Sequence, residues 1–159
     1  MSAEGDVVSS THAYRGRVVS LRLDEIALPS GARIRREVVE HAGSVAIVAL
    51  DADGNVVLVR QHRHAVGRSL LEIPAGTREP GEDALACVHR ELAEETGYTA
   101  DHVERLTGFY AAPGFCTEYL DIYLARGLRP GTARPEEDEG IELVRLPLAE
   151  ALALVAHGE

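Results

Sequence analysis

The segment from Asp83 to Gly97 places the strongest constraint on the fold. An aspartate is a good helix N-cap, and a glycine commonly ends a helix in the left-handed conformation. Between them, Leu85, Val88 and Leu92 recur at spacings of three and four residues, the period of one helix face. The pattern predicts a helix over residues 84–96 whose apolar stripe must pack against another element.

The rest of the chain is dominated by short strand patterns. Apolar or β-branched runs bounded by turn residues are typical of strands. A second helix is expected over residues 148–156 and a long loop over 126–140. Many strands around two helices, in mixed order, predict an α/β sandwich with a mixed sheet rather than a doubly wound one. The expected strands cover residues 44–50, 56–60, 69–73, 103–110, 119–125 and 141–145.

The N-terminal 42 residues are expected to lie outside the main domain. Residues 1–13 are expected to form a flexible tail, and residues 14–28 and 33–40 to form a strand, a turn and a strand. This pair has too few apolar residues for a core of its own. We therefore expect residues 14–42 to form a small antiparallel β-subdomain that packs on another body, such as a partner subunit. The main domain is expected over residues 43–159.

Composition excludes several classes of function. The net charge is −10, so the surface repels nucleic acids and anionic membranes, and neither is expected as a partner. The chain has no lysine, which excludes lysine Schiff-base chemistry and a P-loop lysine. Cys87 and Cys116 are too few for a disulfide framework, and residues 1–13 lack the features of a signal peptide. These features predict a reducing, cytoplasmic setting.

Three carboxylates crowd the C-terminal half of the predicted helix. Glu91, Glu94 and Glu95 lie where the helix dipole disfavours negative charge, and Glu91 and Glu95 repel each other at i,i+4. A solvated acidic face is the simpler interpretation of such a run. A bound divalent cation explains the cluster better, because Mg²⁺ prefers hard oxygen ligands.

The spacing of charged residues and glycines around this helix extends the pattern. Gly76 is followed after five residues by Glu82, then after seven residues by Arg90-Glu91-Leu92, and finally by Glu94-Glu95 and Gly97. Such a combination arises by chance on the order of once in 10⁶ chains. It resembles the Nudix box, the loop–helix–loop signature of hydrolases that cleave nucleoside diphosphates linked to another moiety. Tyr98 departs from the aliphatic residue that usually ends the box.

The resemblance extends over residues 14–158 and indicates the ADP-ribose pyrophosphatase branch of that family. It rests on segments 36–39, 59–63, 72–76 and 112–115 together with Glu118. It implies a Nudix-type α/β/α sandwich, a homodimer that exchanges the N-terminal β-subdomain, and Mg²⁺-dependent hydrolysis of ADP-ribose to AMP and ribose 5-phosphate, with Mn²⁺ as a possible substitute. Similar proteins continue for one more helix after Gly158-Glu159, so the chain is expected to be shorter at its C-terminus.

The resemblance also implies roles for individual residues. The backbone carbonyl of Ala75 and the carboxylates of Glu91, Glu94 and Glu95 are implied as metal ligands. Gly76 and Glu82 are expected to hold the loop and orient these carboxylates. Glu118 is implied as the base that activates water, with Glu94 and Arg90 as further catalytic residues. Arg63 is predicted to clamp phosphate because a guanidinium binds it bidentately. Arg60, Glu72, Pro113 and Gly114 complete the predicted substrate contacts.

Several alternatives remain open at this stage. Glu118 can be an ordinary loop acid, and the acidic run 136–139 competes with it for a water or metal contact. His62 and His64 share a strand region, but two histidines without further soft ligands do not indicate zinc. The substrate can be another nucleoside diphosphate sugar, because the box reads the diphosphate. A non-catalytic ADP-ribose sensor is the alternative from a different class.

Overall fold

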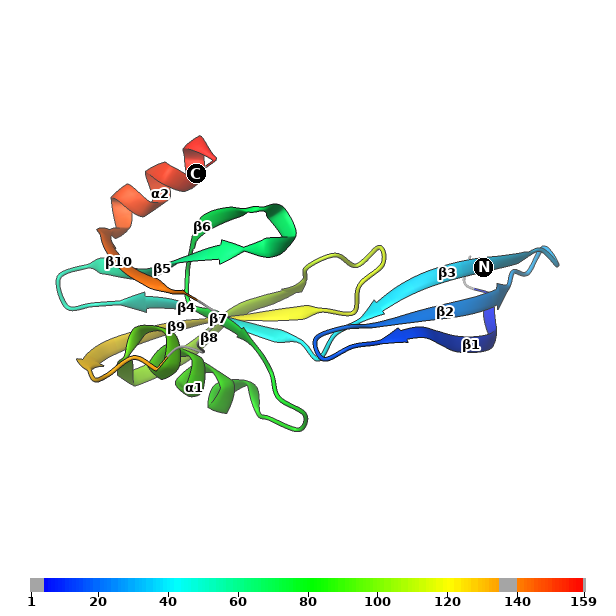
Figure 1. Ribbon diagram of the computed structural model, residues 1–159, viewed down its shortest axis with the longest axis horizontal. Helices are drawn as coiled ribbons and strands as arrows, with labels where there is room; N and C mark the ends of the chain where they lie inside the picture. Colours follow the sequence, from blue (N-terminus) through cyan, green and yellow to red (C-terminus); the bar gives the residue numbers. More distant parts are fainter. Residues whose placement is uncertain (1–4, 135–139, 159) are drawn as a thin grey trace. The chain divides into compact units, whose positions relative to one another are not determined.

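The computed structural model describes residues 5–134 and 140–158, which fall into two compact units (Figure 1). The small unit consists of Met1–Gly43 and Phe109–Leu120, and the large unit of Ser44–Gly108 and Asp121–Glu159. The acidic run 136–139, weighed above as an alternative to Glu118, lies outside the described residues.

The small unit is built on a three-stranded antiparallel sheet. Its strands β1 (Asp6–Arg15), β2 (Ser20–Ala27) and β3 (Arg33–Glu40) are neighbours in chain order. Residues 6–13 therefore belong to a strand, and the expectation of a flexible tail is wrong for them. The main chain of β1 pairs with β2 from Asp6 opposite Ala27 to Arg15 opposite Ser20, although most β1 side chains stay exposed. Backbone pairing forms this strand, so its side chains carry little signal.

Polar contacts replace an apolar core in this sheet. Within β1–β3 the side chain of Asp24 is the buried one, and no apolar side chain there is fully buried. Arg22 donates to Asp24 at 2.9 Å and also pairs with Glu40, while His12 contacts Glu40 at 2.6 Å. The hydrogen bond from Arg22 lowers the pKa of Asp24, and the contact with His12 lowers that of Glu40. The small unit, which has too few apolar residues for a core of its own, is thus stabilised by ion pairs and hydrogen bonds between its strands.

The large unit contains a seven-stranded mixed sheet with two helices. The strand order is β10-β5-β4-β9-β8, with β6 paired to β5 and β7 paired to β4. Strands β4 (Ser44–Leu50) and β5 (Asn55–Arg63) form its centre. A short 3₁₀ turn, His64–Val66, follows β5. The other elements are β6 (Arg68–Glu72), β7 (Ala75–Thr77), α1 (Ala84–Thr96), β8 (Tyr98–Tyr110), β9 (Tyr119–Pro130), β10 (Glu142–Pro147) and α2 (Leu148–His157).

The two helices cover opposite faces of this sheet. Val57 of β5 belongs to the same buried cluster as Val88 and Leu92 of α1. Successive strand residues point to opposite faces, so Val56 and Leu58 point away from α1. Their cross-strand partners on β10 are Leu146 and Val144, which line a cavity of about 390 Å³ together with Leu154 of α2. The arrangement confirms the predicted α/β/α sandwich.

The predicted helix 84–96 is confirmed in both of its end signals. The side chain of Asp83 accepts a hydrogen bond from the backbone N–H of Leu85 at 2.9 Å, and Gly97 has a φ of +72°. The predicted burial of Leu85 is wrong, because this residue lies in the first turn and is 42% exposed, whereas Val88 and Leu92 are fully buried. The loop predicted from residue 126 is also wrong at its start, since β9 continues to Pro130.

Candidate active site

The C-terminal half of α1 carries two buried carboxylates. Glu91 and Glu95 are only 8% and 4% exposed, whereas the side chain of Glu94 is about half exposed. Glu91 and Glu95 are four residues apart and therefore share one helix face. A buried carboxylate is costly unless it is paired or coordinated, so this face needs partners.

Strand β7 supplies some of those partners. The backbone N–H of Ala75 donates to Oε2 of Glu95 at 3.1 Å. A Cβ on Gly76 would lie 1.9 Å from the carboxyl carbon of Glu91, so the glutamate side chain fills the space that any other residue would need. The main chain of β7 at Ala75 and Gly76 therefore lies against both buried carboxylates.

Arg90 binds three glutamates at once. Its Nε and Nη2 each donate to Glu82 at 2.9 Å, and its Nη1 donates to Glu91 at 2.7 Å and to Glu94 at 3.1 Å. The hydrogen bonds with Arg90 lower the pKa of Glu82 to about 2, and contact with Glu82 raises that of Arg90. Arg90 thus compensates the negative charge of the cluster and ties Glu82 to α1.

The loop between β7 and α1 is fastened around Glu82. Arg78 donates to the backbone oxygen of Glu82 at 2.6 Å, and the backbone N–H of Glu79 donates to its carboxylate at 2.9 Å. Arg90 also donates to the backbone oxygen of Thr77 at 3.2 Å. Glu82 therefore links the loop to the helix.

The donor set of this cluster fits a hard divalent cation. Carboxylate oxygens on one face of α1 are ligands of the kind that Mg²⁺ prefers. In the part of the chain that the structure describes, no three histidine, cysteine or acidic side chains are arranged as a ready metal cage. In this arrangement Arg90 contacts Glu91 and Glu94 and so takes up part of their negative charge. Burial raises the pKa of Cys87 to about 12, which argues against a thiolate nucleophile on this helix.

The two arginines predicted to bind substrate lie on strand β5 but point to opposite faces of the sheet. The guanidinium of Arg63 donates to Glu72 through Nε at 3.0 Å and through Nη2 at 2.6 Å. Arg63 and Val57 have the same strand parity, so Arg63 belongs to the sheet face covered by α1. Arg60 belongs to the other face and lines the cavity beside α2. The predicted pair therefore does not act from one face, and Arg63 is the one on the side of the carboxylates.

Glu118 lies in the small unit, on a loop that follows Pro113 and Gly114. Its side chain is 29% exposed, and Nδ1 of His41 lies 3.9 Å from its Oε1. The backbone N–H of Ala111 donates to the carbonyl oxygen of Glu118 at 3.1 Å and closes the neck of the loop. Sequence reasoning missed His41, because 77 positions separate it from Glu118 and no local motif marks it.

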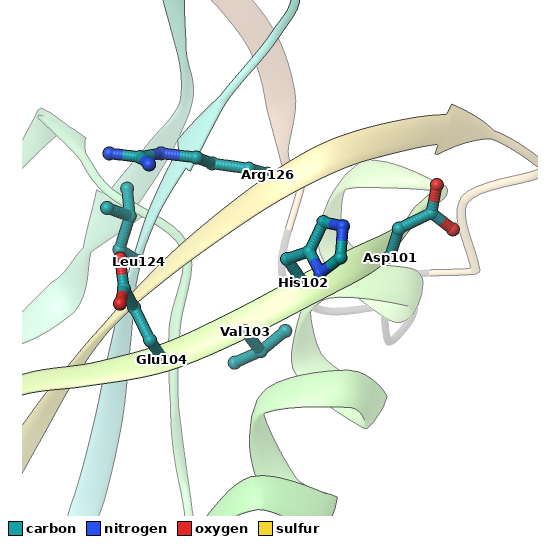
Figure 2. Close-up of a pocket in the computed structure, with 6 residues that line it drawn as sticks. All are labelled: Asp101, His102, Val103, Glu104, Leu124 and Arg126. Carbon is teal, nitrogen blue, oxygen red and sulfur yellow. The ribbon is translucent and has the colours of Figure 1, made fainter.

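A further cavity lies on the sheet of the large unit. It has a volume of about 500 Å³ and is lined by residues of β8 and β9 (Figure 2). Figure 2 shows His102 and Glu104 on one strand and Arg126 on its neighbour. None of the residues predicted for the site lines this cavity.

No helix among residues 5–134 and 140–158 is both long and apolar enough to cross a membrane.

Comparisons with known proteins find a family model and relatives that cover most of the chain. The NUDIX domain model matches residues 40–159. The chain is 42% identical over 158 residues to the ADP-ribose pyrophosphatase of Mycobacterium tuberculosis, covering 97% of this chain and 76% of that protein. It is 38% identical over 160 residues to the ADP-ribose pyrophosphatase of Bacillus subtilis (99% and 86% covered). It is also 40% identical over 154 residues to the methanol dehydrogenase activator of Bacillus methanolicus (96% and 83% covered).

A solved structure extends the comparison to the fold. The crystal structure of an ADP compounds hydrolase superposes with a TM-score of 0.84 at 25% identity, covering 96% of this chain and 83% of that one. The match therefore includes the small antiparallel sheet as well as the mixed sheet. With the box spacing, the buried glutamates of α1 and the family match, these likenesses show that the chain belongs to the Nudix family of pyrophosphohydrolases.

Proposed function

We propose that the protein hydrolyses the pyrophosphate bond of ADP-ribose to give AMP and ribose 5-phosphate, with Mg²⁺ as its cofactor and Mn²⁺ as a substitute. The observation that carries the proposal is the pair of buried carboxylates, Glu91 and Glu95, packed against β7. The substrate assignment is supported by the two relatives named ADP-ribose pyrophosphatase, which are similar over nearly the whole chain.

The metal would be held by oxygen atoms of β7 and α1. Glu91 and Glu95 are the main ligands in this proposal, with Glu94 and the backbone carbonyl of Ala75 beside them. Bound Mg²⁺ supplies Lewis-acid stabilisation of the phosphate charge. Arg90, Glu82 and Gly76 hold the carboxylates in place, because Arg90 contacts Glu82, Glu91 and Glu94 and Gly76 leaves room for Glu91.

Glu118 is proposed as the general base. It removes a proton from the attacking water, whose oxygen bonds to one phosphorus while the bridging oxygen leaves with the other phosphate group. Such a base contributes roughly 10²–10⁴-fold to the rate. Pro113 and Gly114 are proposed to shape the loop that carries Glu118 against the substrate.

Arg63 is proposed to bind a phosphate of the substrate. Its guanidinium lies on the α1 side of the sheet, and Glu72 fixes its orientation through two hydrogen bonds. Arg60 is expected to contribute less to phosphate binding, because it points to the opposite face of the sheet.

The small unit is proposed to serve as the dimerisation element of a cytoplasmic homodimer. Several of its apolar side chains are exposed, among them Val7, Tyr14 and Val18 at 59%, 60% and 52%. We expect light scattering at micromolar concentration to give twice the mass of one chain. A monomeric mass would contradict the dimer and leave the hydrolase assignment untouched.

A substrate panel tests the proposed reaction. Purified protein is incubated with ADP-ribose, ADP-glucose or GDP-mannose in Mg²⁺, Mn²⁺ or EDTA, and nucleoside monophosphate is measured by chromatography. We expect AMP and ribose 5-phosphate in equal amounts from ADP-ribose, and no turnover in EDTA. Preferred turnover of another nucleotide sugar would replace the substrate. ADP-ribose binding without turnover in either metal would favour the sensor alternative.

A further inference from the structure

The loop that carries Glu118 is fastened to the end of strand β3. The backbone N–H of Val39 donates to the carbonyl oxygen of Phe115 at 2.7 Å, and the backbone N–H of Thr117 donates to that of Val39 at 2.9 Å. Val39 and Cys116 form a parallel bridge. The loop thus pairs alongside β3 as a short parallel strand would, which fixes its main chain up to the residue before Glu118.

The side chain of Thr117 adds a second attachment one residue further along. Its Oγ1 accepts a hydrogen bond from the backbone N–H of His41 at 2.9 Å and donates to the backbone oxygen of His41 at 3.3 Å. Both backbone polar groups of His41 are therefore bound by the hydroxyl next to Glu118. With the bond from Ala111 to Glu118 on the other side, the main chain of Glu118 is held from both directions.

The ring of His41 occupies the space beside the Glu118 carboxylate. The histidine side chain is 9% exposed, and the backbone N–H of Gly43 donates to its Nδ1 at 3.1 Å. This hydrogen bond fixes the position of the ring relative to the main chain of Gly43. The distance of 3.9 Å from Nδ1 to Oε1 of Glu118 is too long for a hydrogen bond. The ring therefore lies beside the carboxylate and limits the orientations open to it.

We propose that Thr117 and His41 are positioning residues for Glu118: Thr117 fixes its main chain and His41 restricts its carboxylate. The inference rests on the proposed role of Glu118 as the general base. A base must lie within about 3 Å of the attacking water, and a displacement of about 1 Å can cost up to 10²-fold in rate. Loosening either residue should therefore slow the chemical step and leave substrate binding nearly unchanged.

Four single variants test the two positions in matched pairs. His41→Ala removes the ring, whereas His41→Asn keeps an oxygen that can accept from the N–H of Gly43. Thr117→Val removes the hydroxyl at constant shape, whereas Thr117→Ser keeps it. With ADP-ribose and Mg²⁺ we expect kcat to fall about 10–100-fold in His41→Ala and Thr117→Val, with KM within about two-fold. Thr117→Ser should recover most of the rate, and His41→Asn only part of it, because the amide keeps the contact with Gly43 but not the ring.

A double-mutant cycle distinguishes action through Glu118 from a general structural effect. Once Glu118→Gln has removed the base, adding His41→Ala should lower kcat no further, because coupled residues do not give additive losses. The His12→Ala variant serves as the control, since His12 is another histidine of the small unit and contacts Glu40 instead. It should retain wild-type kcat, and melting temperatures of all variants identify any that fail to fold.

The outcomes separate the inference from the proposed function. If Glu118→Gln retains wild-type kcat, the base assignment fails and the inference falls with it. If Glu118→Gln is slow while Thr117→Val and His41→Ala keep wild-type kcat, the base stands and the inference is overturned. Equal losses from His41→Ala with and without Glu118 also overturn it. Should His41→Ala fail to fold, the comparison of Thr117→Val with Thr117→Ser decides alone.

Discussion

Different interactions stabilise the carboxylate cluster of α1 and β7 in the large unit and the Glu118 loop in the small unit. In the cluster, side-chain charge dominates: Arg90 binds Glu82, Glu91 and Glu94 within one stretch of chain. In the loop, main-chain hydrogen bonds to β3 dominate, and the bonded residues are at least 76 positions apart in the sequence. A charge cluster is visible in a sequence pattern, whereas a main-chain docking site leaves almost no trace in one.

The largest effect is expected from Glu95→Gln in the cluster. We expect kcat to fall by at least about 100-fold, because the variant loses the charge of a proposed metal ligand. The melting temperature in metal-free buffer should hold or rise, since the change relieves repulsion with Glu91 and the amide oxygen can still accept from Ala75. Steady-state kinetics and thermal melts measure both. Glu150→Gln, an exposed helix glutamate of the same unit, is the control. Near-wild-type turnover in Glu95→Gln would reject the metal assignment.

A smaller effect is expected from a methyl group at Gly76. The added Cβ would fall 1.9 Å from the carboxylate of Glu91, so Gly76→Ala must displace that side chain. We expect the Mg²⁺ concentration for half-maximal activity to rise by about ten-fold, together with a lower melting temperature. Gly114 in the loop has open space where its Cβ would lie, so Gly114→Ala should keep the melting temperature of the wild type. Equal melting temperatures for all three proteins would contradict the predicted clash.

The smallest effect concerns stability in acid. Folding lowers the pKa of Glu82 from 4.5 to about 2, so its stabilising contribution is complete above the higher value and is lost as the pH falls through the lower one. Glu82→Gln should therefore melt below the wild type at pH 7, and the two should converge near pH 2. Glu79→Gln, an exposed neighbour in the same loop, should show no such convergence. A difference that stays constant from pH 7 to pH 2 would exclude this ion pair as its source.

Local signals explain how much of the fold could be predicted. The helix 84–96 has a cap at Asp83 and a left-handed glycine at Gly97, and both lie beside the residues they define. The strands 33–40 and 44–50 have continuous patterns and occur with those bounds. Strand β1 was missed because its stability comes from backbone pairing with β2. The extension of β9 to Pro130 was missed because the glycine at 127 is typical of a turn, and here it takes a φ of +66° within the strand.

The same difference between local and long-range signals applies to the candidate site. Glu82, Arg90, Glu91 and Glu95 lie within one motif, so their spacing identified them together. The bonds of Arg90 to Glu82 and Glu91 were not predicted, because side-chain geometry decides which carboxylate it reaches. The separation of Arg60 from Arg63 follows from strand parity and could have been derived from the sequence. His41 could not, because only the fold brings it to Glu118.

The most direct test of the central claim is metal binding at Glu91 and Glu95, measured without substrate. Mn²⁺ is titrated into the wild type and into the Glu91→Gln/Glu95→Gln variant, and free Mn²⁺ is followed by electron paramagnetic resonance. The account predicts that the wild type binds Mn²⁺, that Mg²⁺ displaces it, and that the folded double variant has lost this binding. Equal Mn²⁺ binding by the two proteins would contradict the account.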